Sequence, residues 1–169
     1  MNIHTALARA KLESNVKVVV PCSFDSFLSE FGHPSKGHFR ADLNRIMIEL
    51  LTFLSKHNSP FFATISPFIS LRQNKNISLD FTLFKDNAKP HNDSCKTYKN
   101  IFDLSYDTLV TALSTVGFPK MEIVVSQIGW PTDGITSRSS TATSLGSLLQ
   151  APSPRSSSLG LDLGFHPRK

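Results

Sequence analysis

Residues 123–134 read Ile123-Val124-Val125-Ser126-Gln127-Ile128-Gly129-Trp130-Pro131-Thr132-Asp133-Gly134. The β-branched residues at the start of this stretch favour a buried strand, which we expect over Glu122–Val125. Gly129 and Pro131 are typical of a loop, so regular structure is expected to end before them. The polar Gln127 and the aromatic Trp130 are therefore predicted to lie at or just beyond the carboxyl end of a strand.

Two earlier runs resemble this strand in composition. Val16–Val20 is closed by Pro21, and Phe61–Ile65 is ended by Ser66 and Pro67. Both runs are short, apolar and non-alternating, which is typical of strands buried on both faces of a parallel sheet. We therefore expect three parallel strands.

Amphipathic segments separate the expected strands. Residues 1–15 have helical spacing, and 42–56 give the clearest helix, with apolar residues along one stripe: Leu43, Ile46, Met47, Leu50, Leu51 and Leu54. A further helix is expected over 106–116 with Leu109, Val110 and Leu113 facing inward. The long polar connection 74–98 contains a short apolar piece, 77–84, that we expect to form a hairpin. Helices alternating with short strands predict an α/β fold.

Composition excludes several classes of protein. The chain has 169 residues, of which 40% are hydrophobic, enough for one packed domain. The longest apolar stretches are too short to span a membrane. No secretory signal is recognisable, so the chain as written is expected to be cytoplasmic or of unknown location. The two cysteines form no disulfide framework, and Cys22, His33 and His38 lack the spacing of a metal site, so we expect no metal and no cofactor.

The net charge of +5 is unevenly distributed. Residues 1–134 hold 14 basic and 12 acidic side chains, whereas 135–169 hold four basic side chains and Asp162 alone. The basic character therefore belongs mainly to the end of the chain. Without a basic face or an aromatic platform, the sequence does not favour nucleic-acid binding.

The expected pattern of strands and helices stops after Gly134. Residues 135–169 form a Ser/Pro/Arg-rich tail with nine Ser and three Thr, which we predict to be disordered. Such an abrupt change is what a frameshift or a retained intron would produce. A regulatory low-complexity tail is the alternative.

The stretch from Ile123 to Gly134 resembles the signature of glycoside hydrolase family 17, the plant endo-1,3-β-glucanases and their relatives. That signature has apolar residues, a small residue, Glu, one variable residue and then Gly-Trp-Pro. Further matches, in the expected order and spacing, are Pro34-Ser35-Lys36-Gly37 with Phe39-Arg40, Pro67-Phe68-Ile69-Ser70-Leu71, and Phe102-Asp103 with Tyr106-Asp107-Thr108-Leu109. The resemblance covers residues 1 to about 134.

The resemblance implies a (β/α)8 TIM barrel with its active site at the carboxyl ends of the strands. Val16–Val20, Phe61–Ile65 and Glu122–Val125 would be strands five, six and seven. A full barrel needs about 250 residues. Residues 1–134 are therefore expected to form a partial barrel, whose two open sheet edges favour self-association.

The family's chemistry requires two carboxyl groups, a general acid and a nucleophile. The resemblance places the nucleophile Glu at position 127, where this chain has Gln127, and no Asn-Glu dipeptide is present to supply the acid. An amide is a poor nucleophile and does not stabilise an oxocarbenium ion. We expect a β-1,3-glucan-directed family member that is inactive as written. A noncatalytic β-glucan-binding pseudoenzyme and a nonfunctional relic are the alternatives.

Two aromatic residues are the candidate substrate contacts. The resemblance places Trp130 beside the cleft, where an indole can stack on a sugar ring, although a structural role next to the Gly-Pro turn is equally compatible. Phe68 follows the second expected strand at a position where the family has an aromatic residue. Because Ser66 departs from the family's usual Tyr there, a core position for Phe68 is the favoured alternative.

Overall fold

The computed structural model describes residues 3–94 and 96–130. The chain divides into two compact units, 1–129 and 130–169, and the first contains every helix and strand described here. The predicted tail at 135–169 lies outside the described residues. Within the described ranges, no helix is both long enough and apolar enough to cross a membrane.

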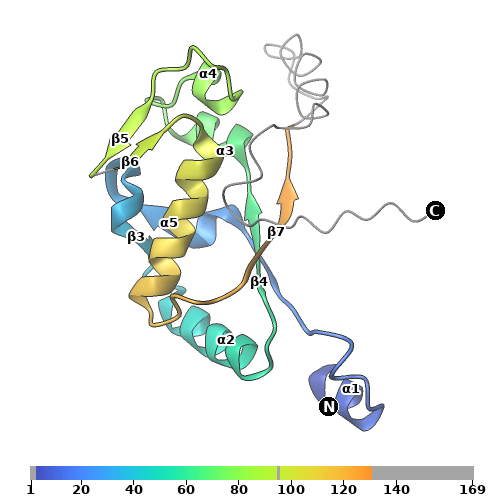
Figure 1. Ribbon diagram of the computed structural model, residues 1–169. Coiled ribbons are helices and arrows are strands. Elements are labelled where there is room, and N and C mark those ends of the chain that lie inside the picture. Colours follow the sequence, from blue (N-terminus) through green and yellow to red (C-terminus); the bar gives the residue numbers. More distant parts are fainter. Residues whose placement is uncertain (1–2, 95, 131–169) are drawn as a thin grey trace, which may run out of the picture. The chain divides into compact units, whose positions relative to one another are not determined.

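The centre of the first unit is a three-stranded parallel sheet (Figure 1). Its strands are β1 (Pro21–Cys22), β4 (Phe61–Ile65) and β7 (Ile123–Ile128), in the order β1-β4-β7. β4 pairs in parallel with both neighbours. The predicted α/β class with a parallel sheet is confirmed, and β4 occupies the predicted residues.

The first predicted strand was misplaced. Residues 16–20 have no regular structure, and Val16 and Val20 are largely exposed. The strand instead begins at Pro21, because Pro21 and Cys22 are the residues that align with Phe62 and Ala63 of β4. Proline is tolerated there since it occupies the first position of an edge strand. Pairing with β4 therefore outweighs the β-propensity of the valines.

Helices α2 (Asn44–Lys56) and α5 (Ile101–Thr115) cover one face of the sheet. The Asn100 side chain caps α5 by accepting a hydrogen bond of 2.8 Å from the Asp103 backbone N–H. The short helix α1 (Ile3–Arg9) buries no residue of its own and contacts the end of α2, where the His4 and His57 rings lie 3.8 Å apart. The predicted helix over residues 1–15 is thus shorter than expected.

The core lies between the sheet and these two helices. Its buried members come from β1, β4, α2, α5 and the hairpin described below: Cys22, Phe27, Phe39, Met47, Leu51, Leu54, Phe61, Ala63, Leu109, Ala112 and Leu113. Two predicted inward residues are wrong, because Ile46 is 61% exposed and Val110 is 36% exposed.

A small hairpin follows β1 and packs on α5. It pairs β2 (Phe27–Ser29) with β3 (Gly37–Phe39), and short 3-10 turns lie around it: η1 (Phe24–Ser26), η2 (Glu30–Gly32) and η3 (Pro34–Lys36). A Cβ on Gly37 would collide with the Thr108 carbonyl of α5. Only glycine therefore permits this close approach.

An insert lies between β4 and α5. It contains α3 (Pro67–Gln73), α4 (Leu79–Thr82) and a second hairpin, β5 (His91–Asp93) with β6 (Lys96–Tyr98). The predicted hairpin at 77–84 is wrong, because this segment forms α4, which Ser78 caps by accepting from the Phe81 N–H. The Tyr98 hydroxyl donates to Asp107 at 2.8 Å and fastens β6 to α5.

Candidate functional site

The two faces of the sheet differ in what covers them. Along β4, Phe61 and Ala63 are buried in the core with α2 and α5, and Ile65 is also buried, whereas Phe62 and Thr64 are half-buried. Successive side chains of a strand point to opposite faces. Phe62 and Thr64 therefore lie on a second face that neither α2 nor α5 packs against, and we call it the uncovered face.

Gln127 lies on the uncovered face near the carboxyl end of β7. It aligns with Thr64 in the ladder, and directly paired residues of a parallel sheet share a face. Its side chain is exposed. Sequence analysis predicted Gln127 at a strand end, and the structure places it inside β7, one residue before the strand's last residue, Ile128.

Phe68 lies at the same end of the sheet. β4 ends at Ile65, and Phe68 is the second residue of α3, which follows directly. The guanidinium carbon of Arg72 lies 5.9 Å from the centre of the Phe68 ring, a cation–π contact. Phe68 is half-buried, and its roles as a sugar contact or as a core residue stay predictions.

Trp130 follows β7 and is the first residue of the second unit. Its indole is half-buried. Gln127 belongs to the first unit and Trp130 to the second, so a site that contains both residues stays a prediction. Figure 1 shows β4 and β7 running in the same direction, which brings the Gln127 and Phe68 ends of these strands to one edge of the sheet.

Asp93 is a buried carboxylate that no sequence motif predicts, and it is only 7% exposed. It accepts hydrogen bonds from the Ser35 N–H at 2.6 Å and from the Ser35 hydroxyl at 2.8 Å, and His33 Nδ1 lies 3.3 Å away. Burial alone would raise the pKa of Asp93, but the bonds from Ser35 and the nearby His33 outweigh it and lower that pKa. Nothing in the polar stretch around Asp93 signals this burial.

This carboxylate joins the second hairpin to the turn η3. Across the described ranges, no three His, Cys, Asp or Glu side chains are arranged to hold a metal ion. The arrangement of Asp93 with Ser35 is that of a structural fastening, since both carboxylate oxygens already have partners within the protein.

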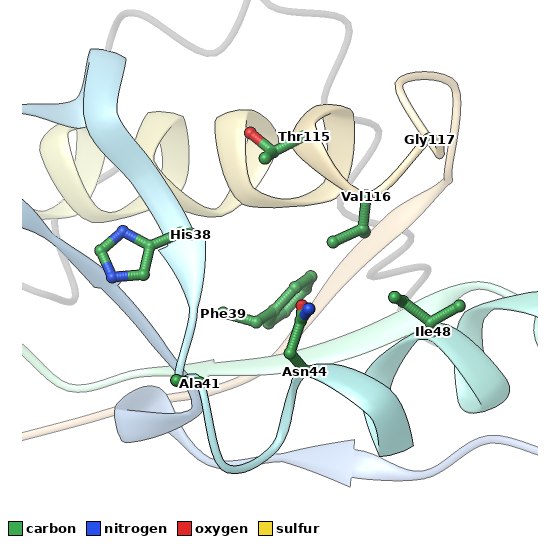
Figure 2. Close-up of a pocket in the computed structure, with 8 residues that line it drawn as sticks. All are labelled: His38, Phe39, Ala41, Asn44, Ile48, Thr115, Val116 and Gly117. Carbon is green, nitrogen blue, oxygen red and sulfur yellow. The ribbon is translucent and has the colours of Figure 1, made fainter.

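A hollow of the described structure lies elsewhere. It is an open groove of about 690 Å³ between β3, the start of α2 and the end of α5 (Figure 2). Figure 2 shows apolar side chains of Phe39, Ile48 and Val116 in its lining, together with the polar side chains of His38, Asn44 and Thr115. The groove lies on the helix-covered side of the sheet, so it is separate from the face that carries Gln127.

Comparison with known proteins agrees with the resemblance noted in the sequence. The profile of the family described as "Glycosyl hydrolases family 17" matches residues 1–157. The chain belongs to glycosyl hydrolase family 17. The match includes the core, the uncovered face and the stretch around Gln127.

Curated relatives within family 17 are plant glucosidases. The chain is 72% identical over 134 residues to glucan endo-1,3-β-glucosidase 9 of Arabidopsis thaliana, covering 79% of this chain and 28% of the relative. It is 34% identical over 136 residues to a glucan endo-1,3-β-glucosidase of Vitis vinifera, covering 80% of this chain and 39% of the relative. The chain thus spans well under half the length of these relatives.

Solved structures of the family have the same fold. A β-1,3-glucanase and allergen of Cryptomeria japonica pollen superimposes with a TM-score of 0.78 at 32% identity, covering 87% of this chain and 46% of that protein. A plant β-glucan endohydrolase superimposes with a TM-score of 0.76 at 29% identity, covering 87% of this chain and 48% of that protein.

Proposed function

We propose that this family 17 chain is part of a β-1,3-glucan-directed protein and that its sheet corresponds to strands five to seven of a (β/α)8 barrel. The parallel order β1-β4-β7, with α2 and α5 packed together against one face of the described sheet, supports this proposal. In such a barrel the helices lie outside and the other face of the strands looks inward. The uncovered face would then be the barrel interior, and the Gln127 end of the sheet would be the substrate end.

The second part of the proposal concerns position 127. Retaining glycosidases use a carboxylate that attacks the anomeric carbon and stabilises the oxocarbenium-like transition state. We place Gln127 at that nucleophile position, because it lies near the carboxyl end of β7, is exposed and shares the uncovered face with Thr64. A neutral amide supplies neither the nucleophile nor the negative charge, so the chain as written does not hydrolyse glucan.

A glucan-binding role is the second candidate. The exposed amide of Gln127 carries both a donor and an acceptor, which is the complement that sugar hydroxyl groups require. Loss of the carboxylate removes the chemistry but leaves this hydrogen-bonding capacity. Phe68, at the same edge of the sheet, would add an apolar surface for a sugar ring.

The experiment compares hydrolysis and binding on the same purified chain. Reducing-sugar release from laminarin measures hydrolysis, and calorimetric titration with laminarihexaose measures binding. We expect no hydrolysis above the rate without protein, and binding that weakens about tenfold in Gln127→Ala. The matched control is Gln73→Ala, which changes an exposed glutamine at the end of α3.

The outcomes separate the two parts of the proposal. Hydrolysis that scales with protein concentration and disappears in Gln127→Ala would show that the amide does not abolish activity. Equal binding of laminarihexaose and cellohexaose, or equal weakening by Gln127→Ala and Gln73→Ala, would contradict a β-1,3-glucan site at Gln127.

A further inference from the structure

The ladder between β4 and β7 contains one irregularity. Phe61, Phe62 and Ala63 pair in turn with Ile123, Val124 and Val125, after which Thr64 pairs with Gln127. Ser126 is thus an extra residue in β7 and forms a β-bulge. Bulges are rare between parallel strands and are over-represented beside active sites, where they redirect a side chain.

The bulge decides which face Gln127 occupies. In a regular strand, residues 123, 125 and 127 would share one face. Ile123 and Val125 pair with the buried Phe61 and Ala63, so a regular β7 would direct Gln127 to the side covered by helices. The extra residue shifts the alternation by one position and turns Gln127 to the uncovered face.

The side chain of Ser126 fixes this irregularity. Its hydroxyl donates a hydrogen bond of 3.2 Å to the carbonyl oxygen of Ala63, the β4 residue directly before the register shift. A bulge disrupts the ladder locally and leaves the extra residue unpaired. The serine hydroxyl therefore links the extra residue to the partner strand at the disrupted point.

We propose that Ser126 is a positioning residue, whose hydroxyl holds β7 in the bulged register that keeps Gln127 on the uncovered face beside Thr64. The use of Gln127 for glucan binding rests on the proposed function. The orientation of Gln127 does not, because it follows from the register alone.

The test is nuclear magnetic resonance on the isotope-labelled chain, with three variants: deletion of Ser126, Ser126→Ala and Ser126→Thr. The first readout is the nuclear Overhauser effect between the Gln127 side-chain amide and the Thr64 methyl group. The second is the shift of that amide on titration with laminarihexaose. Contacts between residues 61–63 and 123–125 report that the sheet has folded.

We expect the Overhauser effect in the wild-type chain and in Ser126→Thr, which keeps the hydroxyl. Deletion of Ser126 removes the extra residue, so Gln127 should follow Val125 directly and pair with Thr64 in a regular ladder; the effect should persist together with the contacts of residues 61–63 with 123–125. Ser126→Ala should weaken the effect and raise the dissociation constant for laminarihexaose about fivefold, corresponding to loss of one hydrogen bond. Should the deletion fail to fold, the pair Ser126→Ala and Ser126→Thr still decides the role of the hydroxyl.

Two results would overturn the proposal: loss of the Overhauser effect after deletion of Ser126 while the contacts of residues 61–63 with 123–125 persist, or identical behaviour of Ser126→Ala and wild type in both readouts. If the Overhauser effects change as expected but the wild-type chain does not bind laminarihexaose, the positioning role is supported and the proposed glucan-binding function is wrong.

Discussion

The five residues of β4 alternate between two faces of the sheet, and these faces differ in what they contribute to stability and to function. Phe61, Ala63 and Ile65 on one face are at most 1% exposed, whereas Phe62 and Thr64 on the other face remain half-exposed. Burial of apolar surface is the main source of stability. The covered face therefore stabilises the fold, while the uncovered face is free to carry polar groups such as Gln127.

The largest difference between the faces is expected for two adjacent phenylalanines. Phe61→Ala should lower the free energy of unfolding by about 3–5 kcal/mol, because it leaves a cavity in the packed core. Phe62→Ala, its matched control on the uncovered face, should cost less than half as much, since its ring is only half-buried. Urea unfolding followed by circular dichroism measures both, and equal losses would contradict the distinction between the faces.

A second comparison uses two glycines. Gly37→Ala places a methyl group against the Thr108 carbonyl on the covered side and should cost about 3 kcal/mol, the upper end for overpacking. Gly129→Ala, just beyond β7, meets no atom within 4 Å and should change stability by less than about 0.5 kcal/mol. Thermal unfolding distinguishes the two, and a neutral Gly37→Ala would mean that β3 can move away from α5.

The insert depends on charge as well as on apolar packing. Asp93→Asn should cost about 2 kcal/mol near pH 7, because an amide nitrogen then faces the donors of Ser35. Folding lowers the pKa of Asp93. Its carboxylate therefore stabilises the fold at pH values above the ordinary pKa of about 4, and this stabilisation is lost as the pH falls through the lower pKa of the folded state. The difference in the free energy of unfolding between wild type and Asp93→Asn should therefore become smaller below about pH 4.

Urea unfolding at pH 7 and pH 3 measures this change. Asp86→Asn, which alters an exposed carboxylate of the same insert, serves as the control and should leave stability unchanged at both pH values. If the difference in the free energy of unfolding between wild type and Asp93→Asn is the same at pH 3 and pH 7, the charge of Asp93 does not stabilise the attachment of the hairpin.

The smallest effect on stability is expected at Gln127. Gln127→Ala should change the free energy of unfolding by less than about 0.5 kcal/mol, because the side chain is exposed. Calorimetric unfolding of the variant beside the wild type checks this. A large loss would assign Gln127 to the folded core and remove the basis for a binding role.

Much of this arrangement can be predicted from short-range patterns. β4, α2 and the covered side of α5 follow from apolar runs and from helical spacing, and Leu109 and Leu113 are buried as predicted. The sequence also predicts Gln127 at the end of a strand. These features depend only on residues close to one another in the chain.

The sequence-based predictions fail where residues that are far apart in the chain determine the local structure. Residues 16–20 have the higher β-propensity, yet the strand forms at Pro21–Cys22 because β4 fixes the register. The bulge at Ser126 is likewise a property of two strands, and a single serine does not signal it. Asp93 lies in a polar segment, and only its distant partner Ser35 explains its burial.

The pairing of β4 with β7 also determines the order in which this unit can assemble. Phe61 and its partner Ile123 are separated by the whole insert and by α5. During synthesis β4 therefore leaves the ribosome long before its second neighbour exists, and until then only β1 is available to pair with it. Pairings between distant residues form slowly because a long loop must close first. We expect the two local hairpins to form early and Gln127 to reach its place last.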